Sequence, residues 1–345
     1  MGKKNVIILL ISLTALFVLI ALNLMFGSVS IPLSDIKEIV IDRNFDNIIY
    51  TNIVHKTRLP QTIVALGAGM ALGVSGLLMQ TLFRNPLAGP SILGISSGSN
   101  LGVAITMLVT ANIFGFSFSR FGVWGDAAVI LSSLAGATVV LLVILFISHK
   151  IGGTLSVLII GVMIGYLSSS LVSVLKFYSP EEDVYNFVIW GLGSFSRMSP
   201  ERAVLFAVAT VVPSFLSLFL SKSLNLLVLG DRYAENLGLS IKRARLFIIV
   251  FAGFLTAVVT AFCGPIIFIG VAIPHLAKLI ARTSKHSTLI LSTCILGAVI
   301  SLLCNLAARM PGVEHELPIN SVTAFIGAPV VIWVILKRRK ENHLE

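Results

Sequence analysis

Apolar runs long enough to cross a membrane recur along most of the 345 residues, and they constrain the fold more than any other feature. A transmembrane helix needs about 20 predominantly apolar residues, within a range of roughly 17–25. Only 12% of the residues are charged, whereas soluble domains carry about 25%. The sequence therefore predicts an all-α polytopic membrane protein with about ten transmembrane helices. The runs cover 5–27, 60–82, 91–111, 127–148, 154–175, 203–221, 245–262, 265–281, 288–308 and 320–336.

Basic residues are distributed unevenly between the loops that join these runs. If the N-terminus is inside, ten spans return the C-terminus to the same side. Most of the 25 Lys and Arg residues then lie inside, and most of the 15 Asp and Glu residues lie outside. That asymmetry follows the positive-inside rule and predicts that both termini are cytoplasmic. It also explains the net charge of +10 without a nucleic-acid partner.

The polar segments between the runs leave almost no chain for a soluble domain, so we expect a single transmembrane domain over residues 1–345. The first run is too long for a signal peptide and is expected to remain as a span. No G-x-x-x-x-G-K-[ST] motif occurs, so the sequence has no P-loop for ATP hydrolysis. The three cysteines lie in apolar runs without C-x-x-C spacing and predict neither disulfides nor a metal site.

Two other classes of function are disfavoured by what the sequence lacks. An ion-coupled secondary transporter usually needs carboxylates within the membrane, and no acidic residue falls inside a predicted span. A membrane enzyme would need catalytic groups, and no pair of nucleophile and base stands out. The sequence therefore disfavours both an ion-coupled secondary transporter and a membrane enzyme.

Glycines recur at a spacing of four residues within the apolar runs. Small residues on one helix face let neighbouring helices approach closely in lipid. Tight packing between helices is the interpretation we favour for these positions. The glycines concerned are Gly69, Gly73, Gly94, Gly98, Gly102, Gly161 and Gly165.

The stretch RNPLAGPSILG (84–94) interrupts two long apolar runs. Each of its prolines lacks an amide proton and biases the preceding residue away from helix. One helix is therefore expected to end near Asn85 and the next to begin near Ser91. Broken backbone persists in a membrane only where protein or water satisfies its polar groups, so this segment should be packed. The residues expected to form the break are Arg84, Asn85, Pro86 and Pro90.

Four segments together resemble the signature of the FecCD family, the permease subunits of ABC importers for iron–siderophores, haem and cobalamin. The resemblance implies the permease fold of a type II ABC importer, multi-pass in the inner membrane of a bacterium. It also implies a homodimer around a central pathway, two cytoplasmic ATPase subunits and an external substrate-binding protein. The segments are RLPQTIVALGAGMALGVSGLLMQTLFRNPLAGPSILGISSGSNLG (58–102), LNLLVLGDRYAENLGL (224–239), CGPIIFIGVAIPHLAKLI (263–280) and ELPINSVTAFIGAPVVIWVILKR (316–338).

The cytoplasmic segment 224–243 carries a cluster of acids and bases on an amphipathic stretch. Tyr233 and Leu237 lie with Leu229 on its apolar side, and two glycines fit the ends of a short helix. Taken alone, these residues also fit a solvated loop with a basic flank. In the resembling family, the segment forms a pair of short coupling helices that sit in a cleft of the ATPase. The residues that the resemblance implies for coupling are Leu229, Gly230, Asp231, Arg232, Glu235 and Gly238.

Two outer arginines, Arg58 and Arg309, lie where the resembling cobalamin permease has arginines that meet acidic residues of its binding protein. The resemblance therefore implies that both dock such a protein. That permease has a further arginine where this chain has Gln61, and Lys56 is the expected substitute. A simpler alternative is that Arg58 only extends its charge to the membrane interface.

Serines are frequent in the run 154–175, and we expect Ser169 and Ser173 to line the translocation pathway. Serine hydroxyls can also bond back to carbonyls of their own helix and have no further role. The segment KFYSPEEDVYNFVIWGLGSFSRMSP (176–200) follows this run. In the resembling family it forms a short helix beside the mouth of the pathway.

The combined prediction is a permease that moves an iron chelate, a siderophore, into the cytoplasm by alternating access at a homodimer interface. Cobalamin and haem are the alternative substrates, and an ion-coupled secondary transporter is disfavoured. The chain is not expected to be an enzyme or to bind a cofactor or metal, because ATP and Mg belong to the partner ATPase. Its expected partners are a second copy, two ATPase subunits, the binding protein and membrane lipid.

Overall fold

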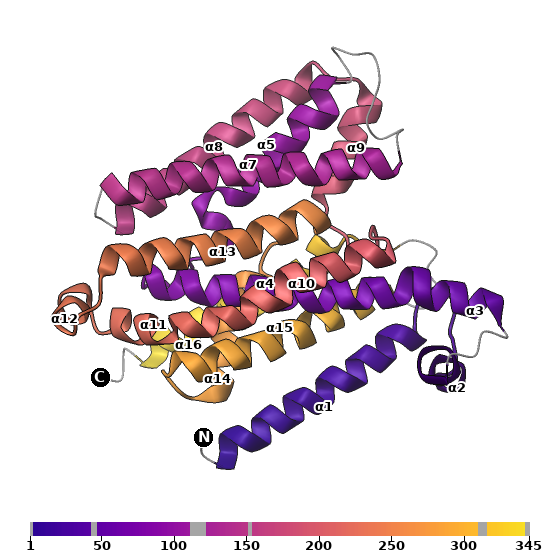
Figure 1. The fold of residues 1–345 in the computed structure, drawn as a ribbon, viewed down its shortest axis with the longest axis horizontal. Helices are drawn as coiled ribbons and strands as arrows, with labels where there is room; N and C mark the ends of the chain where they lie inside the picture. The colour runs from indigo at the N-terminus through magenta and orange to yellow at the C-terminus, as the bar shows by residue number, and fades with distance from the viewer. Residues whose placement is uncertain (1–2, 43–46, 111–121, 151–153, 310–315, 342–345) are drawn as a thin grey trace. The chain divides into compact units, whose positions relative to one another are not determined.

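The computed structural model describes residues 3–42, 47–110, 122–150, 154–309 and 316–341, and Figure 1 shows its helices. Every regular element of these residues is helical. Among them, six apolar helical stretches are long enough to cross a membrane, and four shorter helices are also apolar. One such helix covers each predicted run, which confirms the all-α polytopic fold. Short 3-10 or π segments are η1 (Glu38–Asp42), η2 (Val54–Arg58), η3 (Pro90–Leu93), η4 (Ile105–Val109) and η6 (Ser217–Leu220).

The residues cluster into two compact units, and each unit combines segments that are far apart in the sequence. This division does not test the expectation of a single transmembrane domain over residues 1–345, which stays a prediction. The first unit comprises Met1–Val74, Ser194–Leu218 and Ile267–Glu345, and the second comprises Ser75–Gly193 and Phe219–Ile266.

The first unit is organised around α15, which contacts α1, α14 and α16. The first part of α4 belongs to this unit and is buried along nearly its whole length, as expected for a helix that is apolar on all sides. The helices of the unit are α1 (Lys3–Met25), α2 (Leu33–Lys37), α3 (Ile48–Ile53), the first part of α4 (Leu59–Leu82), α10 (Pro200–Leu216), α14 (Ile269–Ala281), α15 (His286–Ala308) and α16 (Ile319–Glu341).

Glycines set the distance between α4 and α15. A Cβ placed on Gly69 would lie 2.1 Å from the carbonyl oxygen of Gly297, and one on Gly297 would lie 2.3 Å from that of Gly69. No side chain fits such a gap, so the two backbones touch directly. The predicted packing role of Gly69 is thereby confirmed.

The second unit is built on α5, which lies beside α7 and α8 (Figure 1). Gly98 faces Gly136 of α7, where an added Cβ would lie 2.6 Å from the Gly136 oxygen, and Gly94 meets Gly161 of α8 in the same way at 2.8 Å. These contacts confirm the predicted glycine packing. The helices of the unit are the end of α4, α5 (Ile95–Ala104), α7 (Val123–Lys150), α8 (Thr154–Phe177), α9 (Glu181–Gly191), α11 (Ser221–Val228), α12 (Asp231–Asn236) and α13 (Ile241–Cys263).

The predicted break within RNPLAGPSILG is present. Helix α4 ends at Leu82, and the backbone resumes as a 3-10 turn at Pro90 before α5 begins. Arg84 has a φ of 47° and Gly94 a φ of 74°, so the backbone is left-handed at both ends of the segment. Ala88 and Pro90 are buried, as expected of broken backbone that must be packed.

Candidate functional site

The predicted coupling segment forms two short helices, α11 and α12. The turn between them contains Gly230, which has a φ of 114°, and Gly238 follows α12 with a φ of 85°. The Gly238 amide donates to the Glu235 carbonyl at 2.9 Å, and the Leu239 amide donates to the Ala234 carbonyl at 2.9 Å. This pair of bonds is the Schellman ending of a helix. The glycines therefore bound a short helix, as the sequence predicted.

Helix α12 and the residues on either side of it present an exposed apolar face among the described residues. Leu229, Tyr233 and Leu237 are 59%, 67% and 61% exposed. The charged side chains of Arg232 and Glu235 lie exposed on the same short helix. An apolar surface with a charged margin is typical of a protein-binding site. We call these five residues the coupling face.

Asp231 differs from the coupling face because both of its carboxylate oxygens are engaged within the chain. Oδ1 accepts from Nη2 of Arg84 at 2.6 Å, and Oδ2 accepts from Nη2 of Arg245 at 2.7 Å. The sequence placed Arg84 and Asp231 in two separate predicted features, and the structure brings them together. Arg245 was missed, because its separation of 14 residues from Asp231 follows no helical contact spacing.

The other residues of the helix break organise its backbone. The Asn85 side-chain oxygen accepts from the Leu87 amide at 2.9 Å, and the Asn85 carbonyl accepts from the Ala88 amide at 3.1 Å. Asn85 therefore acts as a local turn former. Pro86 is half-buried and Pro90 is buried, so both prolines are structural residues of this segment.

The two arginines expected to dock a binding protein lie inside the first unit. Arg58 is 2% exposed and Arg309 is 6% exposed. Nη1 of Arg58 donates to the carbonyl oxygens of Leu24 and Met25 at 2.6 and 2.8 Å, and Nη2 donates to that of Val29. The docking role stays a prediction, but these bonds would have to open before Arg58 met a partner.

Together the two arginines satisfy the end of α1. The last four carbonyls of a helix have no partner within it. Arg58 takes the last two of α1, and Nη1 of Arg309 donates to the Asn23 oxygen at 3.4 Å. The Leu22 oxygen accepts from the Phe26 amide at 2.9 Å. Positive charge is favourable at this end of the helix dipole, so the pair clamps α1, a role that the sequence analysis missed.

Gln61 belongs to a buried polar network next to this clamp. Its amide donates to Asn305 Oδ1 at 3.2 Å and to both carboxylate oxygens of Glu316 at 3.3 Å. The Asn305 amide donates to Asn23 Oδ1 at 2.8 Å. Burial lowers the pKa of Arg309, and the nearby Glu316 carboxylate raises it. Asparagine and glutamine side chains thus tie α1, α4 and α15 together, whereas Lys56 is exposed and its docking role stays a prediction.

The two predicted pathway serines are exposed on α8. The Ser173 hydroxyl donates to the Ser169 carbonyl at 3.0 Å, a bond within the same helix. The Ser173 hydroxyl therefore has a hydrogen-bond partner within its own helix, whether or not it lines the pathway. The pathway role of both serines stays a prediction. The short helix expected after this run is present as α9, where Phe187 and Trp190 stack at a centroid distance of 6.2 Å in the core of the second unit.

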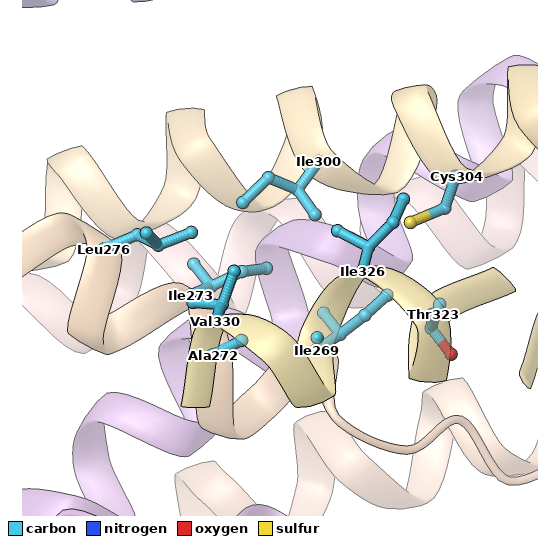
Figure 2. Close-up of a pocket in the computed structure, with 10 residues that line it drawn as sticks. Ile269, Ala272, Ile273, Leu276, Ile300, Cys304, Thr323, Ile326 and Val330 are labelled. Atoms are coloured by element: carbon cyan, nitrogen blue, oxygen red, sulfur yellow. The ribbon is translucent and has the colours of Figure 1, made fainter. Parts of the chain in front are cut away.

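A small pocket in the first unit lies where α14, α15 and α16 meet (Figure 2). Its polar side chains are Thr323, whose hydroxyl donates to Asn320 of its own helix at 3.1 Å, and Cys304. A chelate would need polar partners on burial, so we interpret this pocket as a packing gap. The lining residues are Ile269, Ala272, Ile273, Leu276, Ile300, Cys304, Thr323, Ile326, Gly327 and Val330.

The described helices, six of which are long and apolar enough to cross a membrane, are those of a multi-pass membrane protein. The FecCD transport family profile matches residues 15–337. The vitamin B12 import system permease protein BtuC of Citrobacter koseri is 33% identical over 288 residues, covering 83% of this chain and 84% of that protein. BtuC of Salmonella typhimurium is 34% identical over 286 residues, covering 82% and 83%.

Solved structures agree with this match. A structure described as an inward-facing conformation of a metal-chelate type ABC transporter is 30% identical with a TM-score of 0.81, covering 96% of this chain and 99% of that one. PsaBC from Streptococcus pneumoniae, at 13% identity and a TM-score of 0.50, shares the fold. The chain belongs to the FecCD transport family and is the permease subunit of an ABC importer.

Proposed function

We propose that this permease imports an iron chelate of the siderophore type. The observation that carries this proposal is the similarity to the solved metal-chelate type transporter, which covers 96% of this chain. Cobalamin is the second candidate, because the curated relatives at 33–34% identity are vitamin B12 permeases. Haem is a third chelate of the same class. The substrate is expected to pass between two copies of the chain by alternating access.

The energy for this movement is proposed to come from a separate ATPase that binds ATP and Mg, two subunits for each permease dimer. The absence of a P-loop from the sequence supports this division of labour. The coupling face supports it as well, because Leu229, Tyr233 and Leu237 expose apolar surface next to charged side chains. A cleft in a partner protein that buries these three side chains would gain hydrophobic free energy. The permease itself is proposed to bind no cofactor.

On the opposite side of the membrane, an external binding protein is proposed to deliver the chelate. Lys56 is the exposed cation among the residues considered for docking, whereas Arg58 and Arg309 hold α1. Rim charges of this kind act mainly on the rate of association. The proposed location is the inner membrane of a bacterium, with both termini in the cytoplasm as the distribution of basic residues favours.

A transport assay with labelled candidates tests the proposal. The permease, its cognate ATPase and its binding protein would be reconstituted in liposomes and supplied in turn with a ferric siderophore, haem and cobalamin. We expect ATP-dependent uptake of the ferric siderophore and no ATP hydrolysis by the permease alone. Uptake of cobalamin but not of the siderophore would overturn the substrate assignment. ATP turnover by the isolated permease would contradict a separate ATPase.

A further inference from the structure

The turn between α11 and α12 is held from both sides by one arginine. Nη2 of Arg84 donates to the carbonyl oxygen of Leu227 in the last turn of α11 at 3.0 Å. The same nitrogen lies 2.6 Å from Oδ1 of Asp231, the first residue of α12. A carbonyl at a helix end and a carboxylate at a helix start are both groups that seek a donor. Arg84 therefore fixes the two coupling helices relative to each other.

Asp231 extends this connection to α13. Its second oxygen, Oδ2, binds Nη2 of Arg245 at 2.7 Å. Arg245 lies in the second turn of α13, and α12 contacts this helix (Figure 1). Through one carboxylate, α12 is thus joined both to the residues that follow α4 and to the start of α13. We call Arg84, Asp231 and Arg245 the carboxylate bridge.

The backbone of Arg84 shows that this geometry has a cost. Its φ of 47° lies in the left-handed region, which is unfavourable for a residue with a Cβ. A residue held in such a conformation is stabilised by its surroundings and often marks a functional site. The left-handed turn places Arg84 at the start of the segment that leads to α5, opposite the coupling helices.

We propose that Asp231 is a positioning residue that transmits movement of the coupling helices to α13 and to the helix break at residues 84–94. This inference rests on the proposed coupling role of α11 and α12. A contact transmits movement only if it is kept while its partners shift, and short charge-assisted bonds, of which Asp231 makes two from separate oxygens, are roughly twice as strong as neutral ones. Asp231 acts inside the permease, whereas the coupling face contacts the ATPase.

The Arg84–Asp231 pair of the bridge contributes little to stability, whereas the Arg245 side chain is more buried, at 15% exposed. The side chains of Arg84 and Asp231 are 49% and 41% exposed, and ion pairs with such exposure add little to folding free energy. Replacing Asp231 should therefore loosen the connection without unfolding the permease. The coupling face would still bind the ATPase, but ATP hydrolysis would no longer drive transport efficiently.

The experiment compares Asp231→Asn, Arg245→Gln and Tyr233→Ala in the complete reconstituted complex. Two quantities are measured, the copurification of the ATPase and the amount of chelate taken up per ATP hydrolysed. Asp231→Asn and Arg245→Gln should each lower uptake per ATP about tenfold with normal ATPase binding. Arg245→Lys, which keeps the charge, should be closer to wild type. Arg243→Gln, an exposed arginine on the same helix, is the matched control.

A double variant shows whether the bridge acts as one unit. Asp231→Asn combined with Arg84→Gln should lower uptake per ATP about as much as either change alone, since residues in one network are not additive. Wild-type uptake per ATP in both Asp231→Asn and Arg245→Gln would overturn the bridge. So would weakened ATPase binding in Asp231→Asn, because Asp231 would then be part of the interface. Normal ATPase binding in Tyr233→Ala would instead refute the coupling face, which is a separate failure.

Discussion

Single residues in this permease have roles that their position in the sequence did not indicate. Arg58 opens a predicted span and so resembles a charge at the membrane surface, but its guanidinium group is buried against the end of α1. The sequence offered a misleading signal here, because Gly27 follows α1 as a glycine cap would, yet it does not take the positive φ of such a cap. Tertiary contacts supplied the missing donors.

The clamp at α1 leads to a prediction about stability. Arg58→Met keeps the length of the side chain but removes every donor, so the buried Leu24 carbonyl loses its Arg58 partner, whereas the Met25 carbonyl keeps the Ile31 amide at 3.0 Å. Leaving the buried Leu24 acceptor unsatisfied should lower the free energy of unfolding by about 2 kcal/mol. Thermal unfolding of the purified permease in detergent measures this effect. Lys56→Met, an exposed change two residues earlier, should have an unfolding temperature near wild type, and equal temperatures for both variants would contradict the clamp.

At the scale of elements, the sequence predicted where the helices lie and where one of them breaks. Prolines and the loss of apolar pattern located the end of α4 near Asn85 because these signals act on the local backbone. The glycine spacing predicted close helix packing but not the partners. Gly69 meets Gly297, more than two hundred residues later in the chain, and no local pattern specifies such a pairing.

The contact between α4 and α15 predicts a sharp difference between two glycines. Gly69→Ala would place a Cβ 2.1 Å from the Gly297 oxygen, whereas Gly165→Ala in α8 meets only the Ser97 hydroxyl at 3.4 Å. Overpacking of this kind costs about 1–3 kcal/mol, so Gly69→Ala should unfold at a clearly lower temperature. Gly165→Ala should behave like wild type. Equal stability of the two variants would show that α4 and α15 can separate freely.

At the scale of the whole molecule, the chain forms two compact units, each built from separate stretches of the sequence. The first unit takes residues from the N-terminal, middle and C-terminal parts of the sequence. Burying a helix on all sides, as for the first part of α4, requires neighbours from such distant segments. The distribution of basic residues sets the proposed orientation of this assembly in the membrane.

Orientation is tested by cysteine labelling in intact cells. The native Cys263, Cys294 and Cys304 are buried, so background labelling should be low. Glu181→Cys, at the exposed start of α9, should react with an impermeant reagent added outside, and Ser240→Cys, at the exposed start of α13, should not. The reverse pattern would overturn the proposal of cytoplasmic termini. Gly312, on the same expected outer side, lies outside the described residues.

The sequence by itself determined the class of protein, the helices and the short helices of segment 224–243, because apolar length, proline and glycine act locally on the chain. It also contained the motifs of the family. Only the tertiary structure decided which charged groups meet. Arg84, Asp231 and Arg245 converge from three segments, and Arg58 turns inward to the end of α1. Side-chain partners of this kind depend on how helices pack, and packing is set by contacts between residues that are distant in the sequence.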